Sequence, residues 1–211
     1  MGFDLYGVNP VIEKEYPSRY KEIMKKYGKD GFLDWKLDIP DKIRDEYYEL
    51  KEEYQANNPG DYFRNNVWWW RPLWSFVCQS CDDILTENDM EHGSYNDGHR
   101  ISKTKAVRIG KRLSKLLGNG TVDEIDKKEA LRLAKAKVHN ERVARKVTKI
   151  QNACKKEHGE NIVPANYPEP YKTQWNKARE KEDWTGHYPF DKRNIEDFAK
   201  FCLNSGGFEI C

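Results

Sequence analysis

One third of the way along the chain, a run of tryptophans constrains the fold more than any other feature. Trp68, Trp69 and Trp70 are consecutive and Trp74 follows closely, so the four indoles point in different directions and cannot all enter one core. Only 37% of the residues are hydrophobic and 34% are charged, a balance that favours disorder. The 13% aromatic content favours a folded chain instead, because disordered segments contain few aromatic residues. Because each large ring buries much area, we expect a folded domain with an aromatic core.

Other patterns exclude several protein classes. No stretch approaches the roughly 20 apolar residues that a membrane-spanning helix needs. The N-terminal residues do not show a basic region followed by an apolar run, as a secretion signal would. The five cysteines are an odd set without the spacing of a disulfide framework. We therefore expect a soluble cytoplasmic protein with reduced thiols and no membrane partner.

The residue pattern predicts an α+β fold, a predominantly helical single domain over residues 1–211. Both ends of the chain alternate apolar and polar residues, and we expect the N- and C-terminal strands to pair in a small antiparallel sheet. Spacings of three and four predict two helices within 12–57. Pro72 suits the first turn of a helix beginning there. Capping residues Ser102, Thr121 and Asp191 predict three more helices.

Two polar segments lack a helical pattern. Residues 86–101 are expected to form a loop, and residues 159–190, which are rich in Pro and aromatic residues, are expected to be irregular. Between them lies a basic helical region, 102–156, that would fit a protruding helical hairpin. It carries seventeen Lys or Arg against five Asp or Glu, so the rest of the chain sums to about −10.

The basic region has three interpretations. It can be a nucleic-acid surface, because each neutralised phosphate releases counterions. It can be an ordinary solvated helix face. It can also hold a small anionic ligand, which needs only three or four cations. For the nucleic-acid alternative, the predicted contact residues are Lys135, Arg142, Arg145 and Lys149.

The tryptophan run also predicts a ligand site. Indole rings beside arginines can stack a nucleobase while guanidinium groups hold phosphate, and neighbouring amides suit base-edge hydrogen bonds. The alternative is that the rings fill the core. The loop that ends at His99 would complete the site. The predicted ligand-binding residues are Arg64, Asn65, Asn66, Trp68, Trp69, Trp70, Arg71, Trp74, Asn96, Asp97, His99 and Lys103.

Catalytic and metal-binding patterns are weak. Asp97 and His99 lie in a turn that could place a general base, which leaves a hydrolase as a third hypothesis, although no nucleophile is implied by spacing. Cys78 and Cys81 with His92 or His99 could form half or more of a zinc site, but the pattern has no second Cys pair. We expect no catalytic residue, no metal and no cofactor.

Four motifs stand out along the chain: Gly2-Phe3-Asp4-x-Tyr6-Gly7, Gly60-x-Tyr62-Phe63-Arg64-Asn65-Asn66-x-Trp68-Trp69-Trp70-Arg71-Pro72-Leu73-Trp74, Asn96-Asp97-Gly98-His99 and Ser205-Gly206-Gly207-Phe208. Together they resemble a family of uncharacterised bacteriophage proteins. The resemblance covers both ends and the middle of the chain, while 12–57 and 125–185 look variable. In some relatives the second variable region resembles a Cys-x-x-Cys zinc insertion, whereas here it is rich in Lys and Arg.

The resemblance implies expression in the cytoplasm of an infected bacterium and carries no established activity. In that setting, an aromatic and basic pocket suits an anti-defence protein that acts as a sponge for a cyclic nucleotide or similar immune signal, or that otherwise blocks a host defence protein. This non-enzymatic binder is the leading hypothesis, and nucleic-acid binding by 102–156 is the alternative. Self-association is left open.

Overall fold

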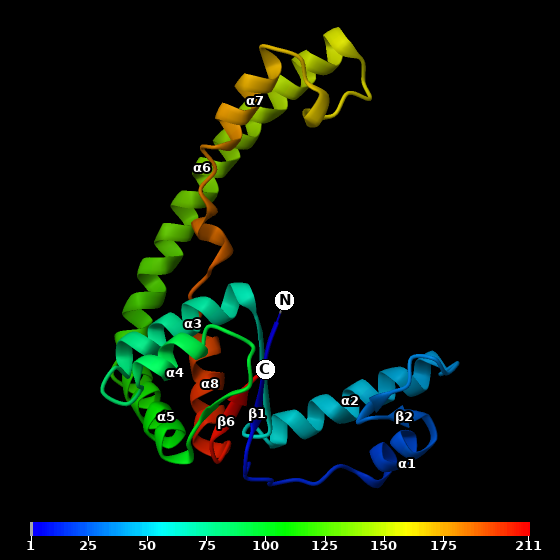
Figure 1. Cartoon of the computed structure of the whole chain (residues 1–211), viewed down its shortest axis with the longest axis vertical. Helices are drawn as coiled ribbons and strands as arrows, with labels where there is room; N and C mark the ends of the chain where they lie inside the picture. The colour runs from blue at the N-terminus through cyan, green and yellow to red at the C-terminus, as the bar shows by residue number, and fades with distance from the viewer. Residues whose placement is uncertain (1) are drawn as a thin grey trace. The chain divides into compact units, whose positions relative to one another are not determined.

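A computed structural model describes residues 2–211, which form eight α-helices, six strands and two short 3-10 turns (Figure 1). Among these residues, no helix has the length and apolarity to cross a membrane. The elements in chain order are β1 (Gly2–Gly7), α1 (Ser18–Tyr27), β2 (Gly28–Lys29), β3 (Phe32–Leu33), α2 (Asp41–Asn57), β4 (Tyr62–Asn66), α3 (Val67–Ser80), α4 (Glu87–His92), β5 (His99–Ile101), α5 (Lys103–Gly118), α6 (Thr121–His158), η1 (Pro164–Asn166), α7 (Tyr171–Arg179), η2 (Trp184–His187), α8 (Lys192–Asn204) and β6 (Phe208–Ile210).

The main sheet has four strands in the order β4-β1-β6-β5, and every neighbouring pair is antiparallel. Leu5 of β1 lies opposite Ile210 of β6, so the first and last strands are neighbours in the middle of the sheet. The predicted α+β class and the pairing of the terminal strands are therefore confirmed.

One face of the sheet forms the core. Phe3, Leu5, Phe208 and Ile210 are almost fully buried on this face, as the two-residue alternation of a half-covered strand requires. Helices α3, α5 and α8 pack against one another; α3 also contacts strands β1 and β4, and α8 contacts β4. The apolar stripe of α5 faces α8, and Gly110 allows the close approach because a Cβ there would lie 2.7 Å from the Leu203 side chain.

Helices α1 and α2 form a smaller core built from tyrosines. Tyr16 stacks on Tyr20 and on Tyr54, with ring centroids 3.9 Å and 3.6 Å apart, and Tyr20 stacks on Tyr47. Ile23 is buried beside them. The two predicted amphipathic helices are confirmed, but the short hairpin of β2 and β3 between them was not predicted.

The helix of the tryptophan run begins earlier than its proline suggested. The expected start at Pro72 is wrong, because α3 starts at Val67 and holds Pro72 inside its first two turns. Asn66 is the reason: its side-chain oxygen accepts hydrogen bonds from the backbone N–H groups of Trp68 and Trp69, at 3.0 and 3.2 Å. This N-cap satisfies two amides that the helix start leaves without partners.

The two segments that were expected to be irregular contain regular structure. Within 86–101, Thr86 and Asp89 form a capping box that starts α4, and β5 follows as an edge strand of the sheet. Within 159–190, the nine-residue helix α7 and two 3-10 turns form. Both helices were missed because their apolar stripes are too short to show a period of 3.6 residues.

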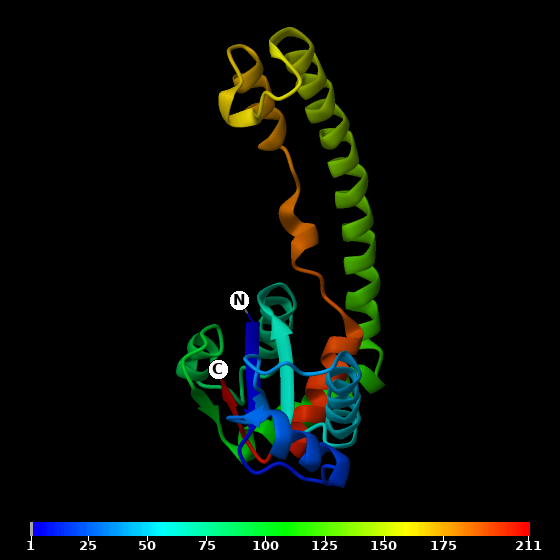
Figure 2. The same ribbon diagram turned by 90° about the vertical axis from the view of Figure 1, so that its right-hand side faces the viewer.

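The described chain forms two compact units, one made of residues up to Val122 together with Asp191–Cys211, the other of Asp123–Phe190. In the second unit, the segment after α6 turns back and runs beside this long helix, with α7 near the C-terminal end of α6 (Figure 2). Ala136, Val143, Ile150 and Cys154 are buried along one side of α6. Their seven- and four-residue spacings define a single packed seam.

Candidate functional site

The four indoles of the tryptophan run have different environments. Trp70 and Trp74 are 0% and 3% exposed, whereas Trp68 is 44% exposed and Trp69 is half-buried. Phe3 and Trp74 each stack on Trp70, with centroids 5.3 Å away. Because the Trp70 side chain is fully buried among these rings, it offers no exposed ring surface on which a base could stack.

Trp70 and Trp74 hold the C-terminal end of α4 against α3. The indole nitrogen of Trp70 donates to the carbonyl oxygen of Gly93 at 2.8 Å, and that of Trp74 donates to the carbonyl oxygen of Met90 at 3.0 Å. Gly93 is required at this contact, because a Cβ atom there would lie 2.1 Å from the Trp74 ring. These bonds satisfy indole groups that burial would otherwise leave unpaired.

A cavity of about 250 Å³ lies between α3 and the end of α4, and we call it the α3–α4 cavity. Its floor is aromatic and its rim is polar. Arg71, Ser75 and Cys78 follow one another at helical spacing on the outer side of α3, which brings a guanidinium, a hydroxyl and a thiol to the same opening. The lining residues are Trp70, Arg71, Trp74, Ser75, Cys78, Met90 and Ser94.

The chemistry of the α3–α4 cavity favours binding over covalent catalysis. Burial raises the pKa of the Cys78 thiol to about 11, so its thiolate is a minor species at neutral pH. The guanidinium group of Arg71 can donate several hydrogen bonds in one plane. A cation with two serine hydroxyls suits an anionic oxygen group on a ligand.

Three of the predicted ligand-binding residues belong to β4 and lie outside the α3–α4 cavity. Arg64 is exposed on the open side of the sheet, with its Nε 3.5 Å from the Asp4 carboxylate. The Asn65 amide donates to Asn194 at 2.9 Å and so joins β4 to α8. Asn66 caps α3. None of the three lines the α3–α4 cavity, because residues alternate sides along a strand and the helix starts only afterwards.

The predicted loop residues belong to a separate polar cluster. The Asn96 amide donates to the Gly2 carbonyl oxygen at 2.5 Å, which ties the loop to β1. Asp97 accepts from the backbone N–H of His99 at 3.2 Å, which stabilises a turn. Lys103 is exposed at the first position of α5. These three residues and His99 all lie outside the lining of the α3–α4 cavity.

The rings of His92 and His99 stack, with centroids 5.2 Å apart, and a carboxylate lies beside each. His92 Nδ1 is 2.5 Å from Asp97, and His99 Nε2 is 3.0 Å from Asp89. The hydrolase hypothesis named Asp97 and His99. In the structure their side chains have different partners, because Asp97 lies against His92 and His99 against Asp89.

Asp89 is the buried centre of this cluster. Its side chain is 5% exposed and accepts hydrogen bonds from the backbone and hydroxyl of Thr86, both at 2.8 Å, from His99, and from the ammonium group of Lys105. Burial alone raises the pKa of this carboxyl, but the hydrogen bonds from Lys105, Thr86 and His99 outweigh it and hold the pKa well below its usual value. With its oxygens fully engaged, Asp89 has a structural role.

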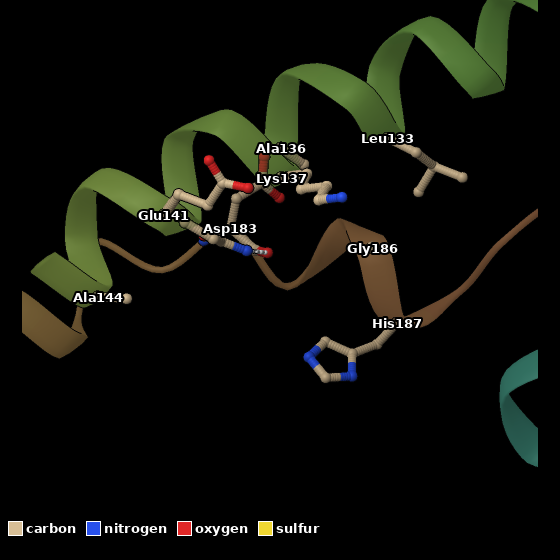
Figure 3. Close-up of a pocket in the computed structure, with 9 residues that line it drawn as sticks. Leu133, Ala136, Lys137, Glu141, Ala144, Asp183, Gly186 and His187 are labelled. Atoms are coloured by element: carbon tan, nitrogen blue, oxygen red, sulfur yellow. Dashed lines mark hydrogen bonds between the residues drawn. The ribbon is translucent and has the colours of Figure 1, made fainter.

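A larger groove of about 580 Å³ lies within the second unit, between α6 and the returning segment (Figure 3). The Asn140 amide and the backbone of Asp183 exchange two hydrogen bonds, at 2.9 and 2.8 Å, which fix the returning chain to the helix. Lys137, Glu141 and His187 also line this groove. Its charges are mixed in sign, so it shows no preference for an anion.

The four cations of the nucleic-acid alternative all lie on α6 and are exposed: Lys135, Arg142, Arg145 and Lys149. No cluster of three or more potential metal ligands exists among residues 2–211, and the Cys78 and Cys81 thiols are free. No protein-family model, no curated protein and no solved structure matches the chain.

Sequence reasoning missed five residues of these sites. Ser75, Met90 and Ser94 line the α3–α4 cavity, while Asp89 and Lys105 form the buried ion pair. A capping-box pattern at Thr86 and Asp89 was present in the sequence and would have identified α4. The three cavity residues carried no comparable signal.

Proposed function

We propose that the protein is a non-enzymatic binder that holds a small, anionic, nucleotide-like ligand in the α3–α4 cavity. The observation that carries the proposal is the convergence of the Arg71 guanidinium with Ser75 and Ser94 around an aromatic-floored cavity of about 250 Å³. Convergent polar groups beside aromatic side chains are typical of ligand sites. A volume of this size holds a phosphate with one adjoining ring, so the rest of a larger nucleotide would lie outside the cavity.

Trp68 supports a nucleotide rather than a bare anion. It precedes Arg71 by three residues, so the two side chains leave neighbouring positions on α3. Because 44% of the Trp68 surface is exposed, its indole can stack a base that protrudes from the cavity. In the phage setting that the motifs imply, such a binder would withdraw a nucleotide signal from a host antiviral defence.

Isothermal titration against cyclic dinucleotides and ADP-ribose-type molecules tests the proposal. We expect one of them to bind at a single site, and Arg71→Ala to weaken binding at least tenfold, as loss of a charge-assisted hydrogen bond predicts. Arg64→Ala is the matched control, because Arg64 is an equally cationic residue outside the cavity. Absence of heat with every ligand, or equal losses in both variants, would contradict the proposal.

A further inference from the structure

Helix α6 presents a row of exposed cations on one side. From residue 135 the exposed positions 142, 145, 149 and 156 follow at spacings of three, four or seven, which places them on one face of a helix. We call this face the α6 basic stripe, and its cations are Lys135, Arg142, Arg145, Lys149 and Lys156.

The α6 basic stripe lies beside the buried seam and extends away from it. Ala136, Val143 and Ile150 of the seam are 3%, 7% and 9% exposed, so this side of α6 is covered. Lys135, Arg142 and Lys149 each precede one of these residues and lie about 100° around the helix, while Arg145 lies about 200° from Val143. All the cations of the stripe are exposed, so the second unit leaves this side of α6 to solvent.

The cations of the stripe are not neutralised within the protein. Among residues 2–211, none of the five forms an ion pair, whereas Arg132 pairs with Glu129 at 2.6 Å and Lys155 lies 3.8 Å from Glu160. No acidic residue occupies a stripe position between 135 and 156, and Glu141 lies on its flank. The stripe therefore offers its positive charge to an external anion.

We propose that the α6 basic stripe binds the phosphate backbone of a nucleic-acid duplex, independently of the ligand site at α3 and α4. From Lys135 to Lys156 the stripe spans 21 residues of the printed sequence, or about 31 Å of helix at 1.5 Å per residue. A duplex carries one negative charge per roughly 1.7 Å of axis, so an anion is available to every cation along that length.

An anionic membrane fits the same stripe less well. A helix that lies on a membrane buries a broad apolar face and keeps its cations at the edges. Two large apolar side chains, Leu131 and Val138, are exposed near the start of the stripe. Beyond them the same face carries Arg142, Arg145, Lys149, Asn152 and Lys156. Two apolar residues do not make the broad apolar face that a membrane needs, so the charge favours phosphate contacts made in water.

Fluorescence anisotropy with the full-length protein tests this inference, using labelled 25-base-pair duplexes of DNA and of RNA and, in parallel, vesicles containing anionic lipid. If four stripe cations neutralise phosphates, raising salt from 50 to 200 mM weakens binding to DNA on the order of 100-fold. Reversing Lys135, Arg142, Arg145 and Lys149 to Glu should abolish binding to the duplex, and changing the same four to Gln should reduce the salt slope by about one per residue.

The matched control reverses Lys21, Lys25, Lys29 and Lys42, which are exposed cations of the first unit, to Glu. It changes the net charge equally and should keep most of the affinity, while circular dichroism verifies that each variant is folded. If the unaltered protein binds only the DNA duplex or only the RNA duplex, that result identifies the kind of nucleic acid it recognises. Equal losses in control and stripe variants, binding to vesicles only, or no duplex binding by the unaltered protein would overturn the inference.

Discussion

The indole nitrogen of Trp70 donates a 2.8 Å hydrogen bond to the carbonyl oxygen of Gly93, so a fully buried side chain of α3 holds the residue that follows α4. Gly93 directly precedes Ser94, which lines the α3–α4 cavity, so this bond links the cavity lining to the buried core. Substitutions at these two residues should therefore affect both stability and the shape of the site.

Trp70→Phe should lower the free energy of unfolding by about 2–4 kcal/mol, because it removes the bond to Gly93 and leaves a void between Phe3 and Trp74. Urea denaturation provides the measurement. Trp35→Phe is the control: Trp35 is 85% exposed, so its substitution should stay within about 0.5 kcal/mol. Equal effects of the two substitutions would show that Trp70 is not a packing residue.

Gly93→Ala should destabilise the protein by at least about 1–3 kcal/mol, since the new methyl group would overlap the Trp74 ring. Gly118→Ala at the end of α5 should have the opposite sign, because nothing lies within 4 Å of a Cβ there and alanine favours a helix by up to about 1 kcal/mol. Differential scanning calorimetry should show melting temperatures that move in opposite directions. A neutral Gly93→Ala would mean that α4 is not held in this position.

Asp89→Asn should remove part of the stability at neutral pH, by about 3 kcal/mol, because Lys105 loses the carboxylate of a buried pair. The folded-state pKa of Asp89 is lowered, so its ionised form stabilises the fold above the unfolded-state pKa of about 4 and this contribution shrinks as the pH falls further. Urea midpoints between pH 2 and 7 should therefore converge for the two proteins in acid. A constant difference across this range would contradict the assignment.

Cys78 should react slowly with iodoacetamide at pH 7 and about tenfold faster with each pH unit up to 10, because burial raises its thiol pKa to about 11. Mass spectrometry of the alkylated peptide measures the rate, and the same peptide from urea-unfolded protein is the control. Since Cys78 lines the α3–α4 cavity, a bound ligand should protect it. Rapid alkylation at pH 7 would show that the thiol is not buried as described.

The parts of the fold that could be predicted are those whose stabilising contacts follow a local period. The stripe of Ala106, Ile109 and Leu113 identified α5, because a helix repeats its buried side every three to four residues. The terminal strands could be paired, because a single strand needs a neighbour to bond its backbone. The start of α3 could not be placed from Pro72, because Asn66 caps the helix and sets its first residue at Val67.

The candidate site could be predicted only in part. Arg71 was recognised by its neighbourhood in sequence, but Ser94 comes from a segment that was expected to be a loop. Asp89 pairs with His99 of β5 and Lys105 of α5, so its role depends on tertiary contacts that the local sequence does not show. A cavity is what remains after helices pack, and no periodic pattern of residues encodes its volume.

The strand order has a consequence for how the molecule is made. β5 joins the main sheet only through β6, its single neighbour there, and more than one hundred residues separate the two strands in the sequence. While a ribosome is still adding residues 102–207, the segment His99–Ile101 cannot form its backbone hydrogen bonds with β6, because β6 has not yet been synthesised. A nascent chain can thus assemble β1 with β4 early, whereas the backbone of β5, and the histidine it carries, must wait until Phe208–Ile210 emerge.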